Sequence, residues 1–287
     1  MNKQLVTFHQ IAPLPYRQLA PYVQDDPEFH RFLAHSPTTI ATYFKCSVKQ
    51  AKQYQAAYAE LSERDIVAEY AAQQIHVICY GDARYPASLY TIYDPPAVLY
   101  VKGNVDALTQ RAIAIIGSRK ATDYSRYAIE QLMPACKRAN VAIVSGLARG
   151  ADTMAHEAAI RHGCATIAVL GHGFMHMYPR EHTKLAAYIA ASHTLVTEYP
   201  YTVGPKKWHF PMRNRIISGL SEAVVVTEAE MKSGTMSTID YALAHGKDIY
   251  AVPGNIFSPL STGPNALIAE GATALTLDEM ASFLQHF

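Results

Sequence analysis

The sequence is poor in the features that mark secreted, membrane and zinc-binding proteins. It has four cysteines among 287 residues, and no two of them form a CxxC pair. This scarcity argues against a disulfide framework or a zinc centre and favours a reducing compartment. The N-terminus lacks the apolar run of a signal peptide, and no segment approaches the ~18 consecutive apolar residues of a membrane helix. We therefore expect a cytoplasmic protein without membrane association.

Common catalytic and nucleotide-binding motifs are missing as well. The chain contains no GxGxxG fingerprint, no GxxxxGK[ST] loop, no GxSxG elbow and no HExxH pair. These absences argue against a nicotinamide dehydrogenase, a P-loop ATPase, an α/β-hydrolase and a zinc protease. His172, His176 and His182 are close in sequence, but their spacing fits no such zinc pattern, and histidines that line a polar turn are the simpler interpretation. We expect no metal, no cofactor and no catalytic residue.

The charge is modest overall but unevenly distributed. The net charge is +1, yet residues 111–217 hold fourteen Lys and Arg against six Asp and Glu, a local charge of +8. Residues 1–110 carry −1 and residues 218–287 carry −6. Such a basic stretch predicts an anion-binding face, although a solvated surface with ordinary scatter would give the same pattern.

The most informative segment is FPMRNRIISGLS, residues 210–221, which lies at the end of the basic stretch. Two arginines flank an asparagine after a proline that can start a helix, and an apolar face follows that can seat the helix on a core. Cations held at a buried helix start are costly unless an anion neutralises them, so the segment predicts a phosphate site. Arg213 and Arg215 are two positions apart and cannot share a helix face, so which of them meets the ligand stays open.

Two regions that differ in composition and in hydrophobic pattern follow one another along the chain. Residues 1–75 are poor in glycine and predict a small all-helical domain, in which residues 47–74 form one helix capped by Ser47. Short apolar strands then alternate with helical segments, which predicts a doubly wound, mostly parallel, Rossmann-like α/β domain over residues 76–287. The predicted strands are 112–116, 141–145, 165–170, 223–227 and 248–252.

Glycine or small-residue turns follow four of these strands. In a doubly wound sheet, ligands bind beyond the carboxyl ends of the strands, where such turns offer backbone N–H groups and positive helix ends to an anion. One turn alone is weak evidence, but four at one sheet edge, together with arginines, predict a phosphate-binding edge. The candidate residues are Gly117, Ser118, Arg119, Ser145, Gly146, Arg149, Gly171, Gly173, Arg180, Lys184, Arg213, Asn214, Arg215, Ser233, Gly234 and Thr235.

Aromatic side chains are interleaved with the basic residues of this region. Single-stranded nucleic acid requires a basic track and flat side chains on which bases can stack, although each aromatic residue is more often part of a core. Glu228 and Glu230 could act as acid or base, but a hydrogen-bonding role that positions the SGT turn at 233–235 is the preferred interpretation. The aromatic candidates are Phe174, Tyr178, Tyr199, Tyr201, Trp208 and Phe210.

Taken together, these segments resemble the DNA-processing protein A family, also called DprA or Smf. The resemblance covers residues 78–275 and rests on ordered blocks that include IAIIGSRKAT, IVSGLARGADTMAH, FPMRNRIISGLS and STGPNALIAEGA. It implies a cytoplasmic, non-enzymatic protein that binds single-stranded DNA, protects incoming strands during natural transformation and loads RecA recombinase.

The same resemblance implies further details. Residues 1–75 correspond to a SAM-like helical domain, and Arg119 and Arg180 belong to a basic pocket. A homodimer is expected, with Leu267 and Ile268 near its interface, although both also fit core packing. Some members continue into a C-terminal winged-helix domain, for which we expect no room before Phe287.

An enzymatic alternative remains. The EAEMKSGT turn is similar to that of the lysine-decarboxylase-like phosphoribohydrolases, which are nucleotide-processing Rossmann enzymes. Those enzymes pair an acidic residue with a Gly-Gly-x-Gly-Thr loop, whereas this chain has SGT and lacks a complete acid–base set.

Overall fold

Five helices precede the first strand in the computed structural model, which describes residues 2–286. Ser47 caps α4 as predicted, because its Oγ accepts the Gln50 N–H at 3.2 Å in a capping box. The prediction of one helix over 47–74 was wrong: a turn separates α4 from α5, and Asp65 caps the second helix through the Ala68 N–H at 3.0 Å. The helices are α1 (Lys3–Ile11), α2 (Tyr16–Asp25), α3 (Pro37–Phe44), α4 (Val48–Leu61) and α5 (Ile66–Ala72).

A nine-stranded sheet follows, in the order β1-β2-β6-β5-β4-β3-β7-β8-β9. Neighbouring strands from β6 to β9 pair in parallel, whereas β2 is antiparallel to both β1 and β6. The predicted α/β class with a mostly parallel sheet is confirmed. The strands are β1 (His76–Cys79), β2 (Val98–Gly103), β3 (Ala112–Ile116), β4 (Ala142–Ser145), β5 (Thr166–Leu170), β6 (Thr194–Thr197), β7 (Ala223–Val226), β8 (Asp248–Ala251) and β9 (Thr273–Ala274).

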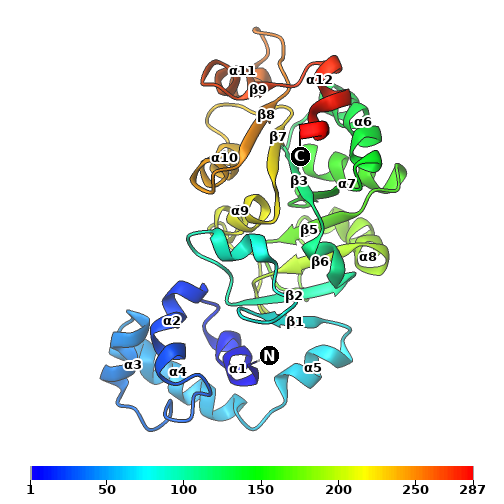
Figure 1. Cartoon of the computed structure of the whole chain (residues 1–287). Helices are drawn as coiled ribbons and strands as arrows, with labels where there is room; N and C mark the ends of the chain where they lie inside the picture. The colour runs from blue at the N-terminus through cyan, green and yellow to red at the C-terminus, as the bar shows by residue number, and fades with distance from the viewer. Residues whose placement is uncertain (1, 287) are drawn as a thin grey trace.

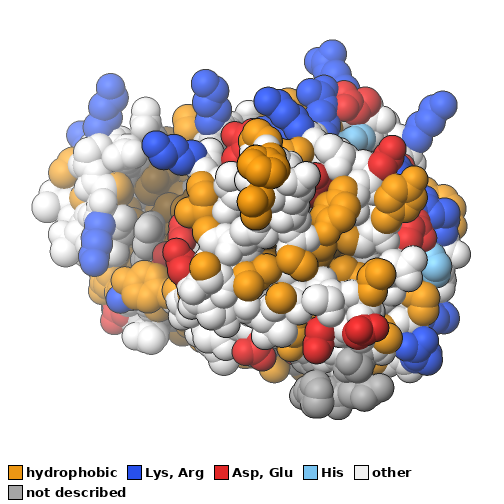
Figure 2. Space-filling model, turned by 90° about the horizontal axis from the view of Figure 1, so that it is seen from above, with side chains coloured by type: hydrophobic (Ala, Val, Ile, Leu, Met, Phe, Trp, Pro, Cys, Tyr) orange, Lys and Arg blue, Asp and Glu red, His pale blue; other side chains and the backbone are white. Residues whose placement is uncertain are grey.

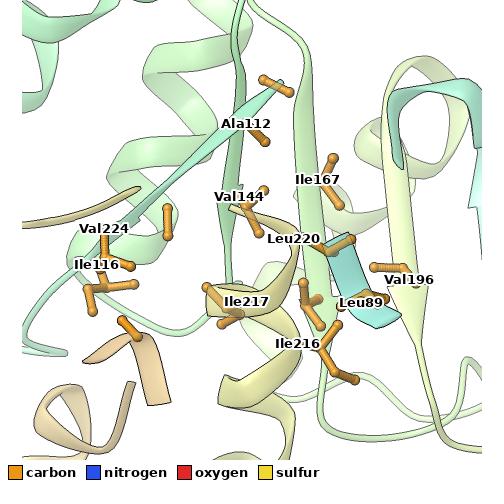
Figure 3. Close-up of a cluster of buried hydrophobic side chains, with 14 of the residues drawn as sticks. Leu89, Ala112, Ile116, Val144, Ile167, Val196, Ile216, Ile217, Leu220 and Val224 are labelled. Atoms are coloured by element: carbon orange, nitrogen blue, oxygen red, sulfur yellow. The ribbon is translucent and has the colours of Figure 1, made fainter. Parts of the chain in front are cut away.

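Helices cover both faces of this sheet, because successive strand residues point to opposite sides. On β3, Ala112, Ala114 and Ile116 join the core under α9 (His209–Leu220), α10 (Gly234–Ala244) and η1 (Ala87–Thr91). Figure 3 shows Ile216, Ile217 and Leu220 of α9 among these strand side chains. Ile113 and Ile115 face the other core. That core lies under α6 (Asp123–Arg138), α7 (Ala151–Arg161) and α12 (Leu277–Ser282).

The remaining elements lie along the same layers. The predicted start of the FPMRNR helix at its proline needs correction, since α9 begins two residues earlier, at His209, and Pro211 falls in the first turn. No helix within residues 2–286 has the length and apolar character needed to cross a bilayer. The other elements are η2 (Val105–Thr109), η3 (Arg180–His182), α8 (Thr183–Ser192), η4 (Pro259–Ser261), α11 (Thr262–Ala269) and η5 (Phe283–His286).

The helical region packs on the β1–β2 edge of the sheet (Figure 1). Val77, Val98 and Tyr100 join the core of the five helices, whereas Leu99 and Val101 face the core under α9. The β1–β2 ribbon therefore contributes to two cores. The division into domains at residues 75 and 76 stays a prediction, although α5 ends at Ala72 and β1 begins at His76.

Candidate anion-binding cleft

A cleft of about 610 Å³ opens where the strand order reverses, between β3 and β7. From β3 the chain continues to β4, β5 and β6 on one side, whereas β7 leads to β8 and β9 on the other. Turns that leave two such strands in opposite directions create a crevice for ligands. A smaller cavity of about 40 Å³ adjoins the cleft and shares five lining residues with it, namely Arg119, Ala148, Tyr178, Phe210 and Arg213.

The first and second glycine turns are packed too closely for a larger residue. A Cβ on Gly117 would lie 2.7 Å from the Ala151 Cβ, and one on Gly146 would lie 2.5 Å from a guanidinium nitrogen of Arg213. Gly146 therefore lets Arg213 lie directly against the backbone of the SGLARG turn. Gly117 lines the cleft and Gly146 lines the smaller cavity, and the expected contact of these turns with an anion stays a prediction.

Arg213 is a buried cation that lines the cleft. Its side chain is 5% exposed, and Nη1 donates to the carbonyl oxygens of Gly146, at 2.6 Å, and of Val169. Nη2 has no hydrogen-bond partner among the residues that the structure describes, and Arg213 lines both the cleft and the smaller cavity. Burial lowers the pKa of Arg213 to about 10, while nearby Asp152 opposes this shift. The guanidinium is thus still charged at neutral pH and presents a donor to the cleft.

Arg215 has a different role from the one predicted for it. Its side chain is 1% exposed and does not line the cleft, and Nη2 donates to Glu198 Oε1 at 2.6 Å. The buried carboxylate satisfies the charge, so Arg215 has no reach to a phosphate in this conformation. As the helical spacing required, the two arginines of α9 point to different sides of the helix, and Arg213 is the one in the cleft.

The other predicted cations differ in whether they form an ion pair and in whether they line a cavity. Arg119 is exposed and lines both cavities, and no ion pair involves it within residues 2–286. Arg180 and Lys184 are also exposed, but they line neither cavity. Arg149 lines the smaller cavity, where its Nε and Nη2 donate to Glu181 at 2.6 and 2.7 Å. Of the predicted exposed cations, Arg119 is therefore the one that is both unpaired and in the cleft.

Several other predicted residues shape the turns by hydrogen bonds. Ser145 is buried, and its Oγ donates to the Ile115 carbonyl at 2.7 Å. Ser118 Oγ accepts the Lys120 N–H, and Thr235 Oγ1 donates to the Gly117 carbonyl at 3.0 Å. Asn214 donates to Ser237 Oγ at 2.9 Å, which links α9 to α10.

Ser118, Asn214 and the start of α10 all line the cleft. Ser233, Gly234 and Thr235 form that start, where the backbone N–H groups of a helix are free to meet an anion. Gly171 and Gly173 do not line either cavity. Gly171 lies against the Phe210 ring, and a Cβ on Gly173 would clash with the Pro200 carbonyl oxygen.

Glu228 holds the first turn rather than the SGT turn. Its carboxylate accepts the Thr122 N–H at 2.7 Å and the Ser125 hydroxyl at 2.8 Å, and its carbonyl accepts the Ser118 N–H at 2.6 Å. The predicted hydrogen-bonding role of Glu228 agrees with these contacts, but the turn that it holds is the one after β3 and not the SGT turn. Glu230, in contrast, is exposed and lines the cleft.

The aromatic candidates separate into two groups. Tyr178 and Phe210 line the cleft with ring centroids 5.4 Å apart, and Trp208 is 63% exposed with Lys206 Nζ 5.4 Å from its ring. These three rings are accessible for stacking. The others belong to the protein interior: Tyr199 is buried, and Phe174 and Tyr201 pack against the core of the helical region.

The three clustered histidines form hydrogen bonds with nearby backbone. His172 bonds to the Gly173 carbonyl and the Tyr178 N–H, His176 to the Thr202 carbonyl, and His182 to the Leu147 carbonyl at 2.9 Å. Burial lowers the pKa of His172, which favours the neutral ring that these two bonds require. These contacts are those of residues that shape turns.

Comparison with known proteins assigns the chain to a family. A sequence model of the family described as DNA recombination-mediator protein A matches residues 76–285. The chain belongs to this family. It is 46% identical to DNA processing protein DprA of Bacillus subtilis over 73% of this chain and 71% of the relative. Identity to the Streptococcus pneumoniae protein of the same name is 42%, over 70% and 72% of the two chains.

Solved structures of the family agree with the fold. The X-ray structure of DprA from Streptococcus pneumoniae superposes with a TM-score of 0.85 at 32% identity, and the match covers 100% of this chain and 98% of the other. A structure of DNA processing protein A from Helicobacter pylori, described for its single-stranded DNA binding mode, gives a TM-score of 0.67 at 28% identity. That match covers 75% of this chain and 97% of the other.

Some cleft residues of this family member were missed by sequence reasoning. Lys120 and Asp152 both line the cleft. Lys120 follows Arg119 in the same turn, so its neighbour could have indicated it. Asp152 is buried, and its burial raises its pKa, while it accepts the Ala148 N–H at 3.2 Å. Nothing in the local sequence indicates that this carboxylate lines the cleft.

The residues expected near a family dimer interface are largely internal. Leu267 of α11 is buried in the core under α9 and α10, and Ile268 is half-buried against the same core. Leu267 is therefore a core residue, the second of the two roles considered for it. The exposed apolar side chains nearby are Ile256 and Phe257, in the loop that precedes η4.

Proposed function

We propose that this protein binds single-stranded DNA in the cleft, protects incoming strands during natural transformation and delivers them to a RecA recombinase. The observation that carries the DNA-binding part is the cleft itself. There the donor face of Arg213, the unpaired Arg119 and the start of α10 surround one cavity of about 610 Å³. Family membership and the single-stranded DNA binding described for the Helicobacter pylori protein support the choice of ligand.

In this proposal the backbone of DNA supplies the affinity. Phosphates meet the guanidinium groups and the N–H groups of the turns, which carry no information on base identity. The accessible rings of Tyr178, Trp208 and Phe210 offer stacking surfaces, which every base can use. Binding is therefore expected to be largely independent of sequence and to favour single strands, because stacking on these rings requires unpaired bases.

A salt titration tests this function. We expect oligo-dT to bind much more tightly than a duplex of the same length, with log K falling linearly against log salt at about 0.7 per neutralised phosphate. Trp208 is the only tryptophan and is exposed, so its fluorescence reports binding without a label. Equal affinity for duplex and single strand, or affinity insensitive to salt, would contradict the proposal.

We also propose that the protein acts without turnover. The Glu228 carboxylate, which the enzymatic alternative would use, accepts hydrogen bonds from Thr122 and Ser125 and does not line the cleft. This engagement supports a positioning role. Incubation with nucleoside monophosphates distinguishes the alternatives, since hydrolysis that disappears in Glu228→Gln would favour the enzyme.

The expected homodimer is proposed to use the loop before η4 rather than Leu267. Ile256 and Phe257 are 79% and 88% exposed, which is unusual for side chains of this size, and contiguous exposed apolar surface often marks an interface. Figure 2, a view of the molecule from above, shows hydrophobic side chains near the centre of this face and several Lys and Arg side chains along its upper edge.

Light scattering tests this location. Phe257→Ser should shift the protein towards monomer, because the substitution removes apolar contact area without disturbing a core. Leu277→Ser, at a side chain that is 71% exposed, serves as the control. A Phe257→Ser variant that stays dimeric at micromolar concentration would argue against this surface.

A further inference from the structure

A partly buried hydrogen-bond network joins the helical region to the segment that leads into the cleft. Tyr70 of α5 is 4% exposed, and its hydroxyl donates to Gln10 Oε1 at 2.8 Å and accepts the Tyr201 N–H at 3.0 Å. Gln10 in turn donates to the Tyr100 hydroxyl on β2 at 2.8 Å. One hydroxyl group therefore links α1, α5 and the chain after β6.

Tyr201 begins a segment, residues 201–208, that ends at the cleft. Its carbonyl accepts the Met175 N–H at 3.0 Å, and the Val203 carbonyl accepts the Gly173 N–H at 2.8 Å. The 201–208 segment is thereby held against residues 173–175, in the turn that follows β5. Its last residues include Lys207, which lines the cleft, and the exposed ring of Trp208.

The 201–208 segment meets α5 at a pocket that is partly open to solvent. A cavity of about 340 Å³ lies between α5 and the 201–208 segment, lined among others by Gln10, Tyr70, Gln73 and Tyr201. Apolar contact alone therefore fixes the segment less firmly here than in a close-packed core. The directional hydrogen bond to the partly buried Tyr201 N–H, which has no other partner within residues 2–286, has correspondingly more influence on where the segment lies.

We propose that Tyr70 is a positioning residue for DNA binding, through which the helical region fixes the 201–208 segment and so places Lys207 and Trp208 at the cleft. This inference rests on the proposed function, because it assigns Tyr70 a role in DNA binding. The role is indirect, since no residue of the helical region lines the cleft. The helical region is then part of the binding machinery rather than an independent attachment.

The chain offers a closely matched control for the test. Tyr58 of α4 is also 4% exposed, and its hydroxyl donates to Gln4 Oε1 at 2.8 Å, the same kind of bond at the same distance. Within residues 2–286, Tyr58 forms no hydrogen bond with the 201–208 segment. Tyr70→Phe and Tyr58→Phe each remove a hydroxyl group that donates to a glutamine and keep the ring that fills the site, but only Tyr70→Phe also removes the acceptor of the Tyr201 N–H.

Two measurements on the two tyrosine variants of the whole 287-residue chain test the proposed role of Tyr70. Hydrogen exchange without DNA should show faster exchange over residues 172–176 and 201–208 in Tyr70→Phe only. Oligo-dT affinity, read from Trp208 fluorescence, should fall about three- to tenfold in Tyr70→Phe, the equivalent of one lost hydrogen bond, and should stay unchanged in Tyr58→Phe. The salt slope should also decrease by up to about one phosphate contact, because Lys207 is displaced.

The outcomes separate this inference from the function on which it rests. Failure of the wild-type protein to bind oligo-dT would reject the proposed function, while unchanged exchange in Tyr70→Phe would reject the coupling by itself. Wild-type binding with an unaltered affinity in Tyr70→Phe would also overturn the inference. Equal losses in both tyrosine variants would assign the effect to general destabilisation and reject a positioning role.

Discussion

The double variant Arg119→Ala, Arg180→Ala is expected to lose oligo-dT affinity by at least about a hundredfold, since hydrogen bonds to charged groups contribute roughly 1.5–3 kcal/mol each. Both side chains are exposed, and neither forms an ion pair within the described chain, so they can meet phosphates without breaking existing contacts. Arg119 lines the cleft, and Arg180 directly follows Pro179, which lines the smaller cavity. Fluorescence titration at fixed salt gives the affinity.

A second double variant controls for the change in net charge. Arg138 and Arg161 lie in the last turns of α6 and α7, and such helix ends lie at the sheet edge opposite the cleft. Arg138→Ala, Arg161→Ala removes the same two charges from there and should weaken binding only slightly, through the long-range field. Comparable losses in the two variants would show that overall charge, and not the cleft, determines binding.

The variant Glu198→Leu is expected to lower the free energy of unfolding by about 3–5 kcal/mol, the typical cost of leaving one charge of a buried ion pair uncompensated. Glu198 and Arg215 are 3% and 1% exposed, so water cannot replace the missing carboxylate. The midpoint of guanidinium unfolding, with the slope held constant, measures the change.

Two companion variants identify the cause. Glu198→Leu, Arg215→Met should recover much of the loss, because an apolar pair of similar volume needs no charge compensation. Glu222→Gln breaks an exposed contact with Arg111 and should cost less than about 1 kcal/mol. A small effect of Glu198→Leu would mean that Arg215 finds another partner or reaches solvent.

Sequence reasoning predicted the central strands well, because their signal is local. AIAII at 112–116 and AVVVT at 223–227 are uniformly apolar and end in a turn, and each was found as a strand within one residue. The sequence did not predict β2 or β6 as strands. β2 lies in a stretch interpreted only as extended and proline-broken, and β6 has four residues and a polar residue at either end.

The sequence predicted where in the fold the candidate site lies, but it did not predict which side chains contact each other there. Glycine turns after parallel strands indicate the sheet edge, and the spacing of Arg213 and Arg215 indicates that only one of them faces it. Which arginine is paired depends on Glu198, which directly follows β6 and lies 17 residues before its partner Arg215. Such long-range partners cannot be derived from local pattern.

The β1–β2 ribbon has a consequence for the evolution and engineering of this chain. Because alternate side chains of the ribbon complete different cores, a cut between Ala72 and His76 would uncover Val77, Val98 and Tyr100. Each such side chain contributes roughly 1.5–3 kcal/mol by its burial. Removal of the helices would thus leave an exposed apolar sheet edge. Recombination of this gene by whole domains should therefore favour breakpoints that keep the β1–β2 ribbon together with the helices.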